Sequence, residues 1–226
     1  MKTLVIIPAF NEEESLKPTI DRLTAVNPSC DYIIINDGSK DHTADICRAN
    51  GYPFIDLPVN LGLSGAFQAG MKYALKHHYD CAIQFDADGQ HRPEYIEQLA
   101  NATKQYDIAI GSRFVNANKP ISGRMLGSNL IQAIIKLTTG VTISDPTSGM
   151  RALNAKTIDL LANDFNFGPE PDTLSCLIKR RGVTVTEVPV TMDERTAGES
   201  YLSPIKAAKY MLRMTISILF IQWFRK

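Results

Sequence analysis

Residues 81–90 read CAIQFDADGQ, an apolar run that passes directly into a turn with two aspartates. A short, continuous apolar run bounded by a turn is typical of a strand buried on both faces of a sheet. Similar runs recur along the first half of the chain, and the segments between them have room for helices. This alternation predicts an α/β protein whose mostly parallel sheet carries helices on both faces.

The pattern on either side of this run gives the order of the elements. We expect strands at 4–7, 32–35, 54–57, 81–85, 108–110 and 183–190. We expect helices at 12–23, 41–49, 64–77, 93–103, 123–139 and 169–181, and a last helix near the C-terminus. Such sheets bind their ligands at the carboxyl ends of the strands. The residues that follow each strand are therefore the first candidates for a site.

The composition restricts the classes of protein. The chain has 226 residues, of which 44% are hydrophobic and 21% charged, as expected for a soluble domain. Lys plus Arg and Asp plus Glu are each 24, so zero net charge excludes a generally basic nucleic-acid binder and an acidic disordered chain. The four cysteines form no Cys-x-x-Cys pair, which excludes the usual zinc site. The apolar run at 4–7 is too short for a signal peptide, so we expect a cytoplasmic protein.

Asp86 and Asp88 are the strongest chemical signal. Two side chains at positions i and i+2 after a strand point to the same side. Their carboxylates can hold Mg²⁺ or Mn²⁺ against a diphosphate, because hard cations take oxygen ligands and share them with phosphate. Gln90 adds a carbonyl oxygen, and His91 follows it directly. The sequence predicts a metal site of Asp86, Asp88 and Gln90; the alternative is an Asp-rich turn without a metal.

Asp37 follows the second predicted strand, where its carboxylate can accept hydrogen bonds from a nucleotide base or from ribose hydroxyls. The alternative is a turn residue before Gly38. Two other nucleotide motifs are excluded. The glycine-rich segment 62–70 lacks the Ser or Thr that a P-loop needs after its lysine, so we expect a tight loop and a closely packed helix there. Residues 8–10 lack the glycines of a dehydrogenase phosphate turn.

The C-terminal segment is basic on one side. Lys206, Lys209 and Arg213 lie at i, i+3 and i+7, on one face of a helix, and no acidic residue follows Glu199. The apolar run 214–224 is shorter than the roughly 20 residues that span a bilayer. We therefore expect 202–226 to be an amphipathic helix that lies on the inner face of the membrane. The alternative is a helix that packs on the core or forms a homo-oligomer.

Four stretches, in order, resemble inverting family 2 glycosyltransferases of the GT-A fold. They are 7–12 (IPAFNE), 36–43 (NDGSKDHT), 60–62 (NLG) and 86–91 (DADGQH). The resemblance implies a nucleotide-sugar donor, with Asp88 and Gln90 on the metal and Asp86 by the ribose and phosphates. The implied contacts with the donor nucleotide are Pro8, Ala9, Asn11, Glu12, Asp37, Asp86 and Ala87.

The second half is similar to the subgroup that glycosylates polyprenyl phosphates, the dolichyl-phosphate mannose synthase type. The matching pieces are GSRF at 111–114, Arg124 with 128–129 (SN), Asp145 with 147–149 (TSG), and Arg195 with 198–200 (GES). This resemblance implies one catalytic domain over 1–201. Residues 1–115 would bind the nucleotide sugar, and 116–201 would receive the acceptor.

The implied reaction is direct displacement of the nucleotide from a hexose, with a UDP-linked donor expected for a short member. A lipid phosphate is already ionised near neutral pH, with a second pKa of about 6, so it needs cations and no base. The candidate acceptor-phosphate residues are Arg113, Arg124, Ser128 and Arg195. The candidate catalytic residues are Asp86, Asp88, Arg113, Arg124 and Asp145.

Two other functions stay open. A hydroxyl acceptor, such as the sugar of a cell-wall or surface polysaccharide precursor, needs a general base to take its proton. Asp145, Glu170 or Asp172 would then supply it. The second alternative is a nucleotide-sugar-binding protein without turnover, against which the intact set Asp86, Asp88 and Gln90 argues.

Overall fold

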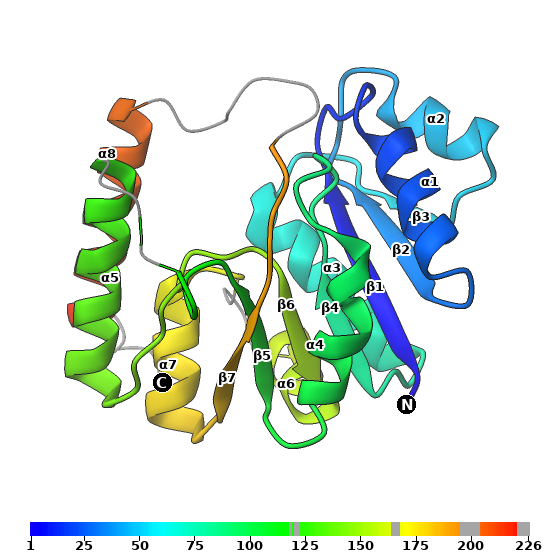
Figure 1. Cartoon of the computed structure of the whole chain (residues 1–226). Helices are drawn as coiled ribbons and strands as arrows, with labels where there is room; N and C mark the ends of the chain where they lie inside the picture. Colours follow the sequence, from blue (N-terminus) through cyan, green and yellow to red (C-terminus); the bar gives the residue numbers. More distant parts are fainter. Residues whose placement is uncertain (118, 120–122, 164–167, 195–203, 221–226) are drawn as a thin grey trace.

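A single seven-stranded sheet organises the chain (Figure 1). The computed structural model describes residues 1–117, 119, 123–163, 168–194 and 204–220; for 123–124 and 204–208 it describes the backbone alone. The sheet order is β3-β2-β1-β4-β6-β5-β7. The strands are β1 (Thr3–Ala9), β2 (Asp31–Asn36), β3 (Phe54–Asp56), β4 (Cys81–Gln84), β5 (Ile108–Ser112), β6 (Arg151–Asn154) and β7 (Val185–Pro189).

Helices cover both faces of this sheet, as expected (Figure 1). The described helices are α1 (Leu16–Val26), α2 (Thr43–Ala49), α3 (Gly62–Lys76), the 3-10 turn η1 (Pro93–Tyr95), α4 (Ile96–Ala102), α5 (Gly123–Thr139), α6 (Ala155–Asn163), α7 (Pro171–Arg181) and α8 (Pro204–Leu219). No helix in the described part of the chain is long and apolar enough to cross a membrane.

β1 explains why the sheet needs two layers of helices. Its residues are all apolar from Leu4 to Ile7, and all four are fully buried. Leu4 and Ile6 pack in the core formed with α3, α5, α6, α7 and α8, whereas Val5 and Ile7 pack in the core formed with α1 and α4. Since successive side chains of a strand point to opposite faces, a strand without polar residues must be covered on both.

Gly70 shows how closely α3 approaches this strand. A Cβ atom at Gly70 would lie 2.3 Å from Cγ2 of Ile6. Gly62, at the start of the same helix, has φ +75°, a backbone conformation that glycine adopts without strain. The glycine-rich segment therefore forms a tight turn and a closely packed helix, as the sequence predicts.

Two elements, β6 and α6, were not expected from the sequence. β6 lies between β4 and β5 and runs antiparallel to both. It has only four residues, begins with a charged side chain, Arg151, and is followed at once by α6. α1 also begins later than expected, at Leu16, because Asn11 has a left-handed φ of 56° and residues 13–15 form a turn.

α8 packs on the core, as the alternative interpretation of the C-terminal segment expects, and its contact with a membrane stays a prediction. It packs against α5 and α7, and Met214, Ser217 and Ile218 are buried there. Leu212 and Ile216 on the same helix remain exposed. Residues 221–226, the end of the expected amphipathic helix, lie outside the described residues.

Candidate functional site

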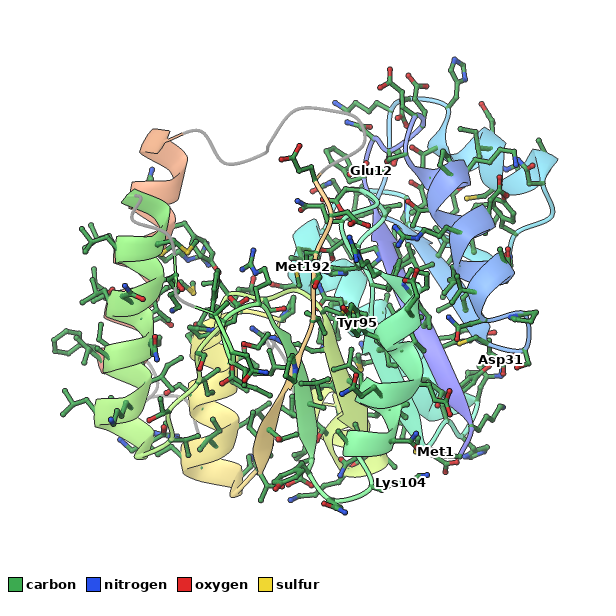
Figure 2. The ribbon with its side chains drawn as sticks, in the orientation of Figure 1. Met1, Glu12, Asp31, Tyr95, Lys104 and Met192 are labelled. Atoms are coloured by element: carbon green, nitrogen blue, oxygen red, sulfur yellow. The ribbon has the colours of Figure 1, made fainter. Side chains whose placement is uncertain are left out.

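The carboxyl ends of β1, β2 and β4 form one edge of the sheet, because the three strands are parallel neighbours. Figure 2 shows Glu12 near this edge and Met1 and Lys104 at the opposite end of the molecule. Ala9 pairs with Asn36, and the Asp37 N–H donates to the Ala9 carbonyl at 2.9 Å. With strands about 4.8 Å apart, the ends that carry Asp37 and Asp86 are about 10 Å apart. The two predicted acidic positions thus share one edge.

The loops after β1 and β2 are fastened to each other. The Asn11 N–H donates to Ser39 Oγ at 3.0 Å, and Asn11 Oδ1 accepts the Lys40 N–H at 2.8 Å. The Glu12 N–H donates to Thr43 Oγ1 at 2.9 Å. A cleft of about 820 Å³ opens beside these loops. Its polar lining includes Asn36, Ser39, Asp45, Arg48, Asp56 and Asn60.

Asp37 supports the loop after β3. It is buried, and its carboxylate accepts the Leu61 N–H at 2.7 Å. Burial raises the pKa of Asp37, although hydrogen bonds from the Leu61 and Gly62 N–H groups act in the opposite direction. Gly38 has φ +65°, and a Cβ there would lie 2.6 Å from the Asn60 nitrogen. Asp37 therefore has a structural role toward the loop after β3, and its nucleotide contact stays a prediction.

His91 holds Asp86 in place. The Asp86 N–H donates to Nδ1 of His91 at 2.9 Å, and Nε2 of His91 lies 3.5 Å from Asp86 Oδ2. Because Nδ1 accepts, a neutral ring carries its proton on Nε2, the nitrogen that faces the carboxylate. His91 is buried with its ring edge against Phe85, whereas the Asp86 side chain is a third exposed. The buried ring of His91 thus holds the solvent-accessible carboxylate of Asp86 in position.

The Asp-x-Asp turn has an ordered backbone and lies close to the loop before β6. Asp88 Oδ1 accepts the Gln90 N–H at 3.1 Å, and Gly89 has φ +80°. A Cβ at Gly149 would lie 2.8 Å from Asp86 Oδ2, so the loop before β6 meets the turn. Among the described residues no three His, Cys, Asp or Glu side chains form a ready metal cage. The oxygen donors of this turn suit a hard cation that completes its shell with phosphate oxygens.

Asp193 links this turn to the segment after β7. Its N–H donates to the Gln90 carbonyl at 2.9 Å. Its carboxylate accepts Arg22 Nη1 at 2.7 Å and Arg92 Nε at 2.7 Å. These hydrogen bonds lower the pKa of Asp193. Sequence reasoning missed this residue, because its partners are far apart along the chain.

Arg113 and Asp145, predicted for separate roles, bind each other. Arg113 donates to the two oxygens of Asp145, from Nε at 2.7 Å and from Nη2 at 2.9 Å. Asp145 is fully buried, and its N–H donates to Glu187 Oε1 at 2.9 Å. The arginine also lies over the Phe114 ring. A candidate base and a candidate phosphate-binding cation are thereby joined in one ion pair.

Ser128 contacts Lys119, a cation that was not among the residues predicted from the sequence. Its buried hydroxyl accepts Lys119 Nζ at 3.3 Å, and Lys119 also donates to Gln132 Oε1 at 2.9 Å. Burial lowers the pKa of Lys119. Arg124 is the second residue of α5, and its side chain is outside the described part; Arg195 lies outside the described residues altogether.

The two remaining candidate bases bind hydroxyl groups. Glu170 Oε1 accepts Ser64 Oγ at 2.8 Å. Asp172 is buried, and its Oδ2 accepts Ser217 Oγ at 2.5 Å, which ties α7 to α8. Asp172 therefore supports helix packing.

A largely parallel sheet with an Asp-x-Asp turn at its carboxyl edge defines the class, a GT-A glycosyltransferase. Residues 4–161 match the profile of glycosyl transferase family 2, and the chain belongs to that family. It is 36% identical over 216 residues to the undecaprenyl-phosphate mannosyltransferase of Micrococcus luteus, covering 90% of this chain and 88% of the relative. It is 32% identical over 227 residues to the polyprenol monophosphomannose synthase of Mycolicibacterium smegmatis, covering 94% and 85%.

A solved structure carries the same fold. It is the glucosyl-3-phosphoglycerate synthase of Mycobacterium tuberculosis in complex with Mn²⁺, uridine diphosphate and glucosyl-3-phosphoglycerate. The TM-score is 0.68 over 98% of this chain and 79% of that chain, at 20% identity. The expected fold and family are thus confirmed, and the chain is a glycosyltransferase.

Proposed function

We propose that this chain transfers a hexose, with inversion, from a nucleotide sugar to a polyprenyl phosphate. One observation carries the choice of acceptor: Asp145, buried and held by both of its oxygens on Arg113, is not placed to take a proton from a hydroxyl. A phosphate oxygen needs no such base. The names of the two relatives, which act on undecaprenyl phosphate and polyprenol phosphate, support the same choice.

The donor half would bind the nucleotide along the edge formed by β1, β2 and β4. The proposed contacts are Pro8, Ala9, Asn11, Glu12, Asp37, Asp86 and Ala87. Asp86, Asp88 and Gln90 would hold Mn²⁺ or Mg²⁺, which supplies positive charge for the departing diphosphate. A UDP-linked donor is proposed, and the solved relative with UDP and Mn²⁺ supports it.

The acceptor half would place the lipid phosphate for attack. A phosphate oxygen forms the bond to the anomeric carbon while the bond from that carbon to the diphosphate breaks. Arg113, Arg124, Ser128 and Arg195 are the proposed phosphate-binding residues. Lys119 adds a cation, because its ammonium group lies on Ser128. Guanidinium and ammonium groups position a phosphate and offset its charge without taking a proton.

The test is a transfer assay with purified protein. UDP-glucose, UDP-N-acetylglucosamine and GDP-mannose are each supplied with a short-chain polyprenyl phosphate and Mn²⁺ or Mg²⁺, and products are read by mass. The proposal expects a glycosyl phosphoryl lipid from one donor, and Asp145→Asn should retain part of that activity. Transfer only to sugar hydroxyls, abolished by Asp145→Asn, would contradict it. Donor binding without any turnover would favour a non-catalytic binding protein.

A further inference from the structure

Arg151 is a charged side chain buried under the helices that cover one face of the sheet. It is the first residue of β6 and is only 4% exposed. Because Leu153, two residues later, packs in the core formed with α3, α5, α6, α7 and α8, Arg151 points to that same face. An arginine is not deprotonated in proteins, and burying its charge is costly unless it is paired or hydrogen-bonded. The partners of Arg151 therefore indicate what it does.

Those partners are main-chain carbonyls of the loop at 145–149, which leads into β6. Nε of Arg151 donates to the Ser148 carbonyl at 3.0 Å, and Nη2 donates to the Pro146 carbonyl at 2.7 Å. No ion pair within the described part of the chain includes Arg151. A planar guanidinium group that donates to two carbonyls of one loop fixes the backbone of that loop.

This loop reaches both halves of the proposed site. At its start, the Asp145 carboxylate accepts hydrogen bonds from Nε and Nη2 of Arg113. At its end, a Cβ at Gly149 would lie 2.8 Å from Asp86 Oδ2. The loop therefore lies between a carboxylate proposed for the metal and a cation proposed for the acceptor phosphate.

The two sides differ in what supports them. Asp86 has supports outside the loop: Gln84 Nε2 donates to its Oδ1 at 3.3 Å, and Nδ1 of His91 accepts its N–H at 2.9 Å. Among the described residues, the guanidinium of Arg113 donates to Asp145 alone. A change that loosens the loop should therefore displace Arg113 and leave Asp86 in place.

We propose that Arg151 is a positioning residue for the transfer reaction, because it fixes the loop that places the Arg113 guanidinium relative to Asp86. This inference rests on the proposed function, in which Arg113 binds the acceptor phosphate and Asp86 binds the metal. Arg151 acts through the two carbonyls of the loop. A displacement of about 1 Å in a group that orients a reactant can lower a rate about 100-fold.

Arg151→Lys is the first test, since it keeps the charge but replaces the planar fork with a single ammonium group. We expect kcat for transfer to a short polyprenyl phosphate to fall about 100-fold and KM for that acceptor to rise about tenfold. The Kd for UDP or GDP with Mn²⁺, whichever nucleotide the active donor carries, should not change. Calorimetry measures that Kd without any transfer.

Gln84→Met is the matched control on the neighbouring strand. Gln84 pairs with Arg151 in the register of β4 and β6 and is 1% exposed, so both substitutions alter a buried polar side chain at the same place in the sheet. Gln84→Met removes the hydrogen bond to Asp86, and we expect it to raise the Mn²⁺ concentration for half-maximal activity about tenfold. The acceptor KM of Gln84→Met should stay unchanged.

Ser148→Ala is a milder change in the same loop, for use if Arg151→Lys does not fold. It removes the hydrogen bond from Ser148 Oγ to the Gly111 carbonyl, which is 2.6 Å long. It should lower kcat and raise the acceptor KM by about two- to fivefold, again with no change in the nucleotide Kd. Equal changes in the nucleotide Kd and the acceptor KM, or a lower melting temperature with both constants unmoved, would make Arg151 a general support of the fold and overturn the proposal.

Hydrogen exchange read by mass spectrometry gives a result that does not depend on activity. In Arg151→Lys, peptides that cover 145–149 should exchange about tenfold faster than in the unaltered protein, while peptides from β1 and β2 should not change. Faster exchange throughout the sheet would contradict the proposal. Local faster exchange in a protein whose unaltered form transfers nothing to polyprenyl phosphate would contradict the proposed function alone.

Discussion

Arg113 and Asp145 form a bidentate ion pair, and the two side chains differ sharply in burial. The carboxylate of Asp145 is fully buried, whereas a third of the Arg113 side chain is exposed. Removing one member is therefore not equivalent to removing the other. The arginine can turn to water when its partner is lost, but the carboxylate cannot.

The pair predicts an asymmetry in stability. Arg113→Ala leaves a buried charge without its partner, and we expect the free energy of unfolding to fall by about 3–5 kcal/mol. Asp145→Asn leaves a neutral amide and an accessible guanidinium, and we expect a loss of about 1–2 kcal/mol. Urea denaturation at neutral pH measures both. An equal or larger loss for Asp145→Asn would contradict this account.

Asp88→Asn tests the metal turn. The substitution keeps the shape of the side chain but removes a negative charge from the proposed site, so we expect transfer to fall about 100-fold or more. Initial rates are measured while Mn²⁺ is titrated. Glu97→Gln, an exposed acid on α4, serves as the matched control and should leave the rate unchanged. Full activity of Asp88→Asn without added metal would exclude this role.

His91 should affect metal use through Asp86. His91→Phe keeps a ring against Phe85 but removes both nitrogens, and we expect half-maximal activity to need about 10–100-fold more Mn²⁺. His91→Asn can still accept the Asp86 N–H and should recover part of that loss. A purely structural role would lower the melting temperature of His91→Phe and leave the metal titration unmoved.

Asp107 predicts how acid destabilises the fold. Burial acts to raise the pKa of Asp107, but hydrogen bonds from Thr184, Asn154 and Lys156 outweigh it and lower the pKa to about 2. Because the pKa in the unfolded chain is about 3.9, this carboxylate stabilises the fold above that pH by about 2 kcal/mol. The contribution is lost as the pH falls from about 4 to 2.

Asp107→Asn should therefore cost about 2 kcal/mol at neutral pH and almost nothing near pH 2. Denaturant unfolding at several pH values measures the difference between the two proteins. A difference that does not shrink on acidification would mean that the ionised carboxylate is not the source of the stability.

The sequence predicted what depends on local pattern. The buried strands β1, β2 and β4 follow from continuous apolar runs, and Asp86 and Asp88 come directly after β4, as expected. Gly70 also behaves as expected, since close packing of a helix leaves no room for a Cβ. Each of these features is decided by residues that are neighbours in the chain.

Features that join distant segments were not accessible in this way. β6 has four residues and no apolar run of its own length, so only its neighbours β4 and β5 make it a strand. Lys119 and Asp193 belong to no recognisable sequence motif, and their hydrogen-bond partners lie on other elements. The ion pair of Arg113 and Asp145 joins residues that are 32 positions apart, and no local pattern in either segment predicts it.

The reversed direction of β6 has an effect on how such an enzyme can diversify. An antiparallel strand begins at the edge of the sheet where its neighbours end. The loop at 144–149, which precedes β6, therefore lies beside the Asp-x-Asp turn, which follows β4. If the proposed function holds, insertions or exchanges in this loop would alter acceptor choice and leave unchanged the strands that are proposed to bind the nucleotide.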